Sequence, residues 1–437
     1  MKNVGIIGGG IIGLCSAYYL NKTGHRVTII DQGDLNDGCS FGNAGMIVPS
    51  HFVPLAAPGM ISKGIRWMFN PNSPFYVRPR FSGRLWKWGY YFYRSSTKEH
   101  VERSIPVLRE ISLLSKAQYR ELSKELPFDF GYQERGLLML YQTSETEKEE
   151  ADTAHLANQN GIEARILSPP EVQALEPDVQ VKARGGIYFP GDAHLTPQQL
   201  VHQLIPLLKN KGVSFLTRTR VNDFVLDKGW VKWVITDKGD FTYDELIIAA
   251  GAWSGILSSK LQLSLPMQAG KGYSITLPGM KKNIRIPSIL VEARVAGTPM
   301  GDAIRFGGTM EITGMDHGIS MNRVKGIVDA IPRYYPEMKV SPPNEEEVWH
   351  GLRPCSPDGL PYIGCLTRLK NVTMATGHSM MGLSLGPGTG KLISEIINEE
   401  KPSMDIAAFH PERFTSPPPA PWRRWAGRHP PNGAGGV

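Results

Sequence analysis

Three glycines near the start of the chain, Gly8, Gly10 and Gly13, have the spacing of a turn that binds a dinucleotide pyrophosphate. Gly8 permits the tight turn, Gly10 lets the backbone approach the pyrophosphate, and Gly13 lets the following helix pack closely on a strand. Asp31 lies 18 residues after Gly13, where a carboxylate can accept hydrogen bonds from both hydroxyls of an adenosine ribose. Because Gln32 and not arginine comes next, we do not expect the site to accept a 2′-phosphate.

The segment around these glycines predicts a strand, a turn, a helix and a second strand in register. Residues 4–7 are an apolar run typical of a buried parallel strand, residues 14–21 have helical periodicity, and residues 26–30 form the second strand. Ile11 and Ile12 stand where the first N–H groups of the helix would face the anion. A secretory signal peptide is the alternative, since Lys2 precedes the apolar segment, but five glycines interrupt that segment and no small-x-small cleavage site precedes the next strand.

Arg353 is a second candidate for chemistry, because it is the one arginine in a segment rich in proline and glycine at residues 351–364. The segment predicts a rigid, irregular backbone. A planar guanidinium with five donors suits bidentate binding of a carboxylate. A structural salt bridge is the alternative role for this arginine.

Glycine-rich residues 377–390 predict a turn followed by a helix over 387–399. The N-terminus of that helix would lie beside the cofactor, so that the end of the chain closes the site that its first residues open. The apolar strand 246–251 ends in Gly251, as expected of a central parallel strand that returns to the cofactor. The small residues of segment 37–46 follow the ribose-binding strand, and we expect them to contact the cofactor rather than form an ordinary surface loop.

With 437 residues, of which 41% are hydrophobic, the chain can bury a large core and should form two domains or one domain with a large insertion. The four cysteines form no C-x-x-C pair, which suits a reducing compartment and argues against a zinc or iron–sulfur site. The net charge of +7 is compatible with an anionic substrate or an anionic membrane surface. Lysines and arginines are spread along the chain without a nucleic-acid motif, so we expect no nucleic-acid partner.

Residues 55–93 are rich in aromatic and basic side chains, among them Trp67, Trp86 and Trp88. This composition is typical of an element that binds at a membrane interface. It is equally typical of a cap that packs on a cofactor domain. We favour packing, and membrane contact stays open as the second interpretation.

The remaining chain predicts alternating helices and strands. Helices are expected over 99–124, 144–160 and 197–209, strands over 132–142, 213–216, 220–226, 230–236 and 241–243, and a mostly antiparallel second sheet over 271–277, 289–294 and 303–311. Asp192 and His194, in a glycine–aspartate turn, are expected to be turn and helix-capping residues.

Several motifs, in consistent order over residues 2–397, together resemble the FAD-dependent D-amino acid oxidase superfamily. They are the N-terminal glycine motif and residues 40–45, 246–251, 271–273, 307–311, 351–354, 357–359 and 377–378. Within the superfamily, residues 56–59, 65–69 and 271–274 are similar to those of bacterial D-amino-acid dehydrogenases rather than to those of glycine or sarcosine oxidases.

The resemblance implies an α/β fold, with a Rossmann-like FAD-binding domain of the glutathione-reductase type and a discontinuous mixed α+β substrate domain. The FAD-binding domain would comprise residues 1–80, 186–260 and 350–413, and the substrate domain residues 81–185 and 261–349. Residues 414–437 match nothing in the family, and we expect them to be disordered or a non-native remnant. FAD would be held noncovalently by Gly8, Gly10, Ile11, Ile12, Gly13, Asp31, Gln32, Ser40, Asn43, Ala44, Gly45, Met46, Val221, Ala250, Gly251, Gly377, His378, Met381, Gly382 and Leu383.

The resemblance further implies an enzyme that oxidises the Cα–N bond of an amino acid to an imine, which water hydrolyses to a 2-oxo acid and ammonia. Arg353 would hold the carboxylate, and Tyr273 would either reach the substrate or lie buried in the seam between the domains. Hydride would pass from Cα of the neutral amine to flavin N5, so that no strong side-chain base is needed. His378 would form a hydrogen bond to the cofactor rather than act as a general base.

The D-configuration follows from the resemblance alone. Small apolar D-amino acids, or cyclic imino acids such as D-proline or hydroxyproline, are the expected substrates, and a quinone or another carrier is the expected electron acceptor. We expect a cytoplasmic enzyme without a metal site, and peripheral contact with the inner membrane stays open. Two alternatives also stay open: an oxygen-using amine oxidase of the glycine or sarcosine type, and a non-catalytic FAD-binding protein.

Overall fold

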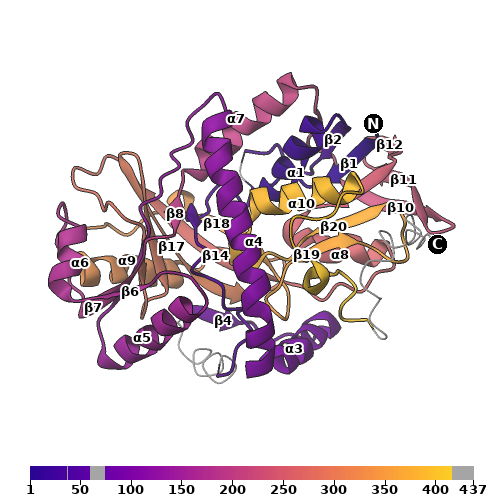
Figure 1. Ribbon diagram of the computed structural model, residues 1–437. Coiled ribbons are helices and arrows are strands. Elements are labelled where there is room, and N and C mark those ends of the chain that lie inside the picture. The colour runs from indigo at the N-terminus through magenta and orange to yellow at the C-terminus, as the bar shows by residue number, and fades with distance from the viewer. Residues whose placement is uncertain (37, 60–73, 416–437) are drawn as a thin grey trace, which may run out of the picture.

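The computed structural model describes residues 1–36, 38–59 and 74–415, and Figure 1 shows two parts, each built around a sheet. The part that carries the N-terminus contains a six-stranded sheet, and the other part contains a nine-stranded sheet. The long helix α4 (Lys98–Glu125) runs between the two parts. The predicted α/β fold, with a Rossmann-like part beside a mixed α+β part, is therefore confirmed.

The six-stranded sheet has the strand order β19-β20-β13-β1-β2-β9. Its strands are β1 (Asn3–Ile7), β2 (Arg26–Ile30), β9 (Ser214–Leu216), β13 (Glu245–Ile248), β19 (Tyr362–Cys365) and β20 (Val372–Thr376), and all but β19 run parallel. The apolar run in β1 is buried, as expected of a parallel strand that is covered on both faces. Because β1 lies between β13 and β2, its carboxyl end opens near the centre of the sheet, where ligands bind in such folds.

Helix α1 (Ile11–Lys22) follows β1 and is buried along most of its length. It packs against α7 (Pro197–Asn210) and α10 (Gly386–Ile397), and α10 also packs on α4. Glycines allow these close approaches: a Cβ on Gly13 would lie 1.9 Å from the carbonyl oxygen of Gly8, and a Cβ on Gly390 would lie 2.6 Å from the backbone of Cys15. The packing holds the N-terminus of α1 beside the turn that follows β1.

The nine-stranded sheet has the order β18-β14-β17-β16-β15-β5-β7-β6, and β4 pairs with β17. Its strands are β4 (Phe75–Val77), β5 (Leu137–Tyr141), β6 (Arg165–Leu167), β7 (Gly185–Phe189), β14 (Gln268–Leu277), β15 (Ser288–Leu290), β16 (Val295–Met300), β17 (Ala303–Ile312) and β18 (Trp349–Cys355). Most pairs are antiparallel, as predicted for the second sheet, but β15 and β5 run parallel, and so do β17 and β4. Helix α9 (Met321–Tyr334) packs on one face of this sheet.

Smaller elements complete the described chain. A three-stranded sheet contains β10 (Val221–Asp227), β11 (Trp230–Thr236) and β12 (Gly239–Phe241), and β3 (Met46–Ile47) pairs with β8 (Ala193–His194). The remaining helices are α3 (Gly83–Ser95), α5 (Ser144–Gln159), α6 (Pro169–Leu175) and α8 (Ser254–Lys260). No helix in the described ranges is both long enough and apolar enough to cross a membrane.

Sheet membership differs in part from the domain ranges expected from the sequence. β4, β7 and β18 lie largely within the ranges expected for the FAD-binding domain, yet all three pair in the nine-stranded sheet. Conversely, α4 lies in a range expected for the substrate domain but packs on α10. Strand pairing joins residues far apart in the chain, so the ranges that the resemblance implies do not mark where the chain crosses from one sheet to the other.

Three local predictions also change. The strand expected over 132–142 is shorter and comprises only β5 (Leu137–Tyr141). The strand expected over 246–251 ends at Ile248, and a turn of 3₁₀ helix (Gly251–Trp253) follows it. Arg353 was expected in irregular backbone but lies in β18. Proline has no N–H to donate to a neighbouring strand. β18 tolerates Pro354 because an edge strand pairs in the sheet on one side only.

The expected disordered tail begins with two residues that the structure places. The Tyr91 hydroxyl donates to the carbonyl oxygen of Phe414 at 3.1 Å, and the centroids of their rings lie 4.8 Å apart. The Thr415 N–H donates to the carbonyl oxygen of Glu412 at 2.9 Å. The rest of the expected tail, 416–437, lies outside the described residues.

Candidate active site

A cavity of about 1100 Å³ is lined by residues of both large sheets and of the loops between them. It brings together Gly8, Gly10, Ile11, Ile12, Asp31, Gln32, Ser40, Asn43, Ala44, Met46, Val221, Ala250, Gly251, Tyr273, Arg353, His378, Met381, Gly382 and Leu383, all of which the sequence singles out. Because these positions span most of the chain, only the fold makes them neighbours.

The turn after β1 forms one wall of the cavity and suits an anion. Gly8 has φ +110°, and a Cβ there would lie 2.4 Å from the carbonyl oxygen of Ala249, so glycine is required. A Cβ on Gly10 would meet only the Ser40 hydroxyl, at 3.5 Å, and this hydroxyl accepts the Ile11 N–H at 3.0 Å. The first turn of α1 contains no acidic residue and Gly10 has no side chain to cap it, so, apart from the Ile11 N–H, the positive end of the helix is available to a phosphate.

Asp31 follows β2 beside this turn, as predicted for a ribose-binding acid. Its Oδ2 accepts the N–H of Gly9 at 2.6 Å, and its Oδ1 accepts the N–H of Gly33 at 2.7 Å. These two bonds fix the orientation of the carboxylate. Each oxygen keeps a further lone pair, so Asp31 can still accept a hydrogen bond from a ligand hydroxyl.

Gly13, Gly45 and Gly377 were also predicted to contact the cofactor, but they do not line the cavity. Gly13 allows α1 to pack on the turn at Gly8. Gly45 has φ +77°, and a Cβ there would clash with the carbonyl oxygen of Leu195 at 2.3 Å. Gly377 has φ +78°, and a Cβ there would clash with the Tyr362 ring at 2.6 Å. The structure gives these three glycines a packing role around the site.

The second helix N-terminus expected at the cofactor, that of α10, lies elsewhere. A Cβ on Gly386 would come within 2.9 Å of the Ile11 side chain, and a Cβ on Gly388 within 2.8 Å of Ser115. The Gly388 N–H donates to the Ser115 hydroxyl at 3.1 Å. The glycine-rich start of α10 therefore packs on α1 and α4, and residues 378–384, which precede it, line the cavity instead. The expectation of a second anion-binding helix end is corrected.

Two side chains of the nine-stranded sheet hold the loop that follows the ribose-binding strand. The Ser274 hydroxyl donates to the carbonyl oxygen of Gly42 at 2.9 Å, and Arg305 Nη1 donates to the carbonyl oxygens of Phe41 at 3.0 Å and Asn43 at 2.9 Å. Arg305 is buried and forms no ion pair within the described ranges, and desolvation lowers its pKa to about 10. The sequence assigns neither side chain this role, because a contact between a side chain and a distant carbonyl leaves no local pattern.

Arg353 lines the cavity from the edge strand β18. Its Nη1 donates to the carbonyl oxygen of Thr309 at 2.6 Å and lies 4.0 Å from the Met310 sulfur, and a Cβ on Gly272 would lie 2.1 Å from its Nη2. No carboxylate in the described part of the chain lies within 4.0 Å of the guanidinium, and desolvation lowers its pKa, although arginine stays charged at neutral pH. A charged group in a cavity wall without a counter-ion suits an anionic ligand.

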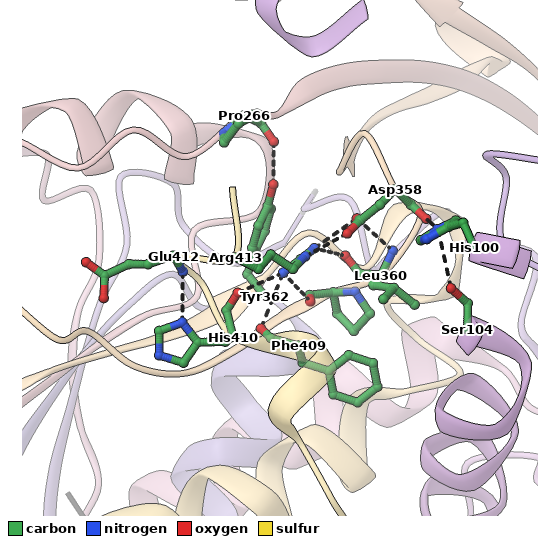
Figure 2. A network of polar contacts seen from close by, with 11 residues as sticks. His100, Ser104, Pro266, Asp358, Leu360, Tyr362, Phe409, His410, Glu412 and Arg413 are labelled. Carbon is green, nitrogen blue, oxygen red and sulfur yellow. Dashed lines mark hydrogen bonds and ion pairs between the residues drawn. The ribbon is translucent and has the colours of Figure 1, made fainter. Parts of the chain in front are cut away.

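The salt bridge of this segment is formed by Asp358 instead, as Figure 2 shows. Arg413 Nε donates to Asp358 Oδ2 at 2.7 Å and Nη2 donates to Oδ1 at 2.9 Å. The remaining guanidinium hydrogens go to the carbonyl oxygens of Leu360, Pro361, Phe409 and His410. His100 of α4 lies 2.8 Å from the carbonyl oxygen of Asp358, so the network fixes the chain after β18 to a helix and to the C-terminal segment.

Tyr273 lies on the other face of the sheet from Arg353. In β14, Gly270 pairs with Arg353, and successive side chains point to opposite faces, so Tyr273 points away from the guanidinium. Its hydroxyl donates to Glu311 Oε1 at 3.1 Å and accepts the Ser320 N–H at 3.1 Å, and desolvation raises its pKa. Tyr273 contributes to the cavity wall, but its hydroxyl is already bonded, so the structure favours the buried-tyrosine interpretation.

His378 is buried where the loop before α10 reaches the cavity. Its Nε2 lies 3.0 Å from the Thr389 hydroxyl, and desolvation lowers its pKa to about 3. The imidazole is therefore neutral at physiological pH. A neutral ring held by Thr389 is compatible with a hydrogen bond to a cofactor and gives no support for a general base.

The aromatic, basic segment 55–93 contains both buried side chains, as a packed cap requires, and exposed ones, as membrane contact requires. Trp88 is 6% exposed and its Nε1 donates to the carbonyl oxygen of Cys355 at 2.9 Å, so it packs and cannot contact a membrane. Trp86, on α3, is 71% exposed, and Phe81, Tyr90 and Tyr93 are also exposed. Trp67 lies outside the described residues.

Comparison with known proteins agrees with this geometry. A model of the family described as DAO, FAD dependent oxidoreductase, matches residues 3–396. The chain is 31% identical to the D-amino acid dehydrogenase of Granulibacter bethesdensis over 416 residues, which cover 94% of this chain and 99% of that protein. It is 30% identical to the D-amino acid dehydrogenase of Paramagnetospirillum magneticum over 419 residues, covering 94% and 98%. Glycine oxidase from Geobacillus kaustophilus has a similar structure, with a TM-score of 0.74 at 23% identity, covering 94% of this chain and 98% of that one.

The family match includes the turn after β1, the cavity loops and Arg353 alike. FAD suits the residues present, because the open end of α1 can receive its pyrophosphate and Asp31 its ribose. Within the described ranges, no group of three or more histidine, cysteine, aspartate or glutamate side chains could hold a metal ion. The protein is therefore an FAD-dependent oxidoreductase, and the chain belongs to the DAO family.

Proposed function

We propose that the protein oxidises the Cα–N bond of D-amino acids to an imine, which water hydrolyses to a 2-oxo acid and ammonia. The observation that carries this proposal is Arg353, a charged side chain in the cavity wall whose hydrogen-bond partners in the described part of the chain are a carbonyl oxygen and a distant sulfur. The relatives named D-amino acid dehydrogenase support the same reaction.

In this proposal, the Arg353 guanidinium binds the substrate carboxylate through two parallel hydrogen bonds and so fixes the position of Cα. The amine binds in its neutral form. His378, which burial keeps neutral, places no positive charge in the cavity wall. FAD, when bound, supplies the acceptor of the hydride that leaves Cα.

We further propose small apolar D-amino acids or cyclic imino acids, such as D-proline or hydroxyproline, as substrates. A quinone or another electron carrier would be the acceptor, and the protein would work in the cytoplasm with peripheral contact to the inner membrane. The exposed aromatic side chains of Phe81, Trp86, Tyr90 and Tyr93 support such a contact, because aromatic side chains favour the interface between water and lipid.

An anaerobic screen of D- and L-amino acids for loss of flavin absorbance tests the proposal. D-amino acids should bleach the flavin, and turnover with an artificial dye should greatly exceed turnover with oxygen. A yellow protein that no amino acid bleaches would support a non-catalytic FAD-binding protein. Fast oxygen turnover with peroxide release would favour an amine oxidase of the glycine or sarcosine type, a reaction class named in a structural relative.

A further inference from the structure

His51 lines the cavity, and two buried side chains connect it to the protein interior. Its Nδ1 lies 3.1 Å from the hydroxyl oxygen of Ser50. The Ser50 hydroxyl donates to Asp192 Oδ2 at 2.5 Å, and the Ser50 N–H donates to Asp192 Oδ1 at 3.1 Å. Because Asp192 is fully buried, a chain of hydrogen bonds leads from the cavity wall to a carboxyl group in the interior.

The carboxylate determines which nitrogen of His51 carries hydrogen. An ionised Asp192 only accepts, so the single hydroxyl hydrogen of Ser50 points to it. The Ser50 oxygen then offers His51 a lone pair, and Nδ1 must supply the hydrogen of their bond. Nε2 is left as an acceptor, and it has no hydrogen-bond partner among the residues that the structure describes.

The charge states of His51 and Asp192 are consistent with this arrangement of hydrogen bonds. Desolvation lowers the pKa of His51 to about 4, so the ring is neutral. Desolvation raises the pKa of Asp192 to about 7, although the hydrogen bonds from Ser50 and the charge of Lys116 lower it by smaller amounts. Lys116 itself forms an ion pair with Glu134 at 3.1 Å. The carboxylate form of Asp192 therefore predominates at mildly alkaline pH.

His51 and Arg353 line the same cavity from different elements. Val48 and Phe52, close to His51 in sequence, belong to a hydrophobic cluster with side chains of β5 and β7. Arg353 belongs to β18, the first strand in the order of the nine-stranded sheet, whereas β5 and β7 lie near the opposite edge. A substrate whose carboxylate binds Arg353 would extend its side chain away from β18. A donor on that side chain would then point toward the wall that the His51 segment shares with β5 and β7.

We propose that His51 is a specificity residue whose Nε2 accepts a hydrogen bond from a hydroxyl group on the substrate side chain. The inference rests on the proposed function and narrows its substrates to hydroxylated D-amino acids or cyclic imino acids. A neutral hydroxyl is favoured over an ammonium group because Met139, Ile289 and Ala296, which also line the cavity, are apolar and would leave a charge unsolvated.

Matched substrate pairs at pH 8.5 test the proposal: D-serine with D-alanine, D-threonine with D-2-aminobutyrate, and 4-hydroxy-D-proline with D-proline. In at least one pair, kcat/KM should favour the hydroxylated member by about tenfold, the effect of one well-placed hydrogen bond. His51→Phe should reduce that ratio to about one. His51→Gln, which retains an acceptor, should keep part of the preference, and His155→Phe, an exposed position on α5, should keep all of it.

Asp192→Asn tests the direction of the hydrogen bonds. The Ser50 N–H requires an acceptor, so the asparagine oxygen should take the place of Oδ1 and its amide nitrogen should face the Ser50 hydroxyl. Ser50 would then donate to His51 Nδ1, and Nε2 would carry the hydrogen. O-methyl-D-serine, whose ether oxygen only accepts, should therefore gain in kcat/KM relative to D-serine in this variant, and the same ratio in both proteins would contradict the proposed direction.

Binding without turnover provides an independent measurement. Perturbation of the flavin spectrum should show tighter binding of 3-hydroxypropionate than of propionate in the wild type but not in His51→Phe. If no D-amino acid bleaches the flavin, the proposed function fails. If D-amino acids bleach the flavin while His51→Phe and His51→Gln change neither the substrate ratios nor the relative binding of the two acids, the role of His51 alone is overturned.

Discussion

Two arginines connected with the segment after β18 have opposite surroundings. Arg413 is enclosed by Asp358 and by backbone carbonyl groups, and all three of its side-chain nitrogens donate hydrogen bonds. Arg353, five residues before Asp358, donates to the carbonyl oxygen of Thr309 and forms no ion pair within the described ranges. Both are largely shielded from solvent, yet only Arg413 has a counter-ion.

The difference in hydrogen-bond partners distinguishes a guanidinium that is saturated by its own protein from one that still has donors for a ligand. A guanidinium that is fully hydrogen-bonded to its own protein has no donor left for a ligand, and removing it leaves its partner carboxylate buried and unpaired. A guanidinium that has lost water without gaining a carboxylate is costly to keep, and a bound anion would offset that cost. Pairs of glycines, carboxylates and tryptophans in this protein can be compared in the same way. In each pair, substitution of the two residues should have different effects.

The largest effect is expected for the two glycines that flank the start of α1. Gly13→Val would place a Cβ 1.9 Å from the carbonyl oxygen of Gly8, and we expect it to prevent folding. Gly10→Val meets only Ser40, so the variant should fold but lose FAD, because the side chain occupies the path of the pyrophosphate. Flavin absorbance and thermal unfolding distinguish the two results, and a yellow Gly10→Val protein would be evidence against the assigned cofactor position.

Arg413→Ala should be the next most damaging change. It leaves Asp358 buried without its partner, which costs about 3–5 kcal/mol in the free energy of unfolding. Chemical denaturation measures this loss. Arg413→Ala combined with Asp358→Asn should recover part of it, because no charge is left unpaired, and equal stability of the single and double variants would contradict the ion-pair explanation.

Asp192 provides the contrast with Asp358, because its hydrogen-bond partner is the hydroxyl and N–H of Ser50 and not a guanidinium. Its pKa in the folded protein, about 7, lies above the ordinary aspartate value of 3.8. The folded state therefore binds the proton more tightly, and this contribution to stability is fully present below pH 4 and is lost as the pH rises to 7. At about 1.4 kcal/mol per pKa unit, wild type should lose up to about 4 kcal/mol relative to Asp192→Asn over this range.

Denaturation of both proteins at pH 4, 5.5 and 8 checks this window. A difference in unfolding free energy that is constant across the three values would show that Asp192 has an ordinary pKa in the folded protein.

Arg353→Met should affect catalysis and not folding. Losing a charged hydrogen-bonded contact with the substrate costs about 1.5–3 kcal/mol, or roughly ten- to a hundredfold in kcat/KM. The unfolding free energy should be unchanged or higher, because the variant removes a charge that desolvation disfavours. FAD should stay bound.

Arg353→Lys provides the control for charge, since it keeps the cation but loses the planar fork, and it should also be impaired. An amine without a carboxylate should be an equally poor substrate for wild type and Arg353→Met. Loss of FAD or of folding in Arg353→Met, with unchanged amino-acid affinity in the remaining holoenzyme, would make Arg353 a structural residue.

The smallest effect is expected on the surface. Trp86 is exposed on α3, whereas Trp88 is buried two residues away. Trp86→Ser should weaken sedimentation with anionic vesicles at low salt by less than about tenfold, as expected for one interfacial side chain, without changing stability. Trp230→Ser, at an exposed position of β11, is the matched control and should bind vesicles like the wild type. Equal effects of the two substitutions would exclude α3 as the contact.

The sequence by itself determined the turn after β1, its acid Asp31, the family and the candidate role of Arg353. The turn and Asp31 were predictable because a glycine turn and the strand and helix around it depend on backbone geometry within about thirty residues. The family followed from the resemblance of several motifs, and the role of Arg353 followed from that resemblance and from the chemistry of its guanidinium. Most helices and strands were likewise predictable from local periodicity, including α4, α5, α7 and β11.

Tertiary structure decided which of these groups line the cavity and which pack in the interior. Strand register turned Tyr273 away from Arg353, helix packing used the glycines of α10, and residues 55 positions apart formed the Asp358–Arg413 pair. The Arg305 contacts and the His51–Ser50–Asp192 chain also join segments far apart in the sequence. None of this has a local signature, because whether a polar group is free for a ligand depends on every neighbour that the fold brings to it.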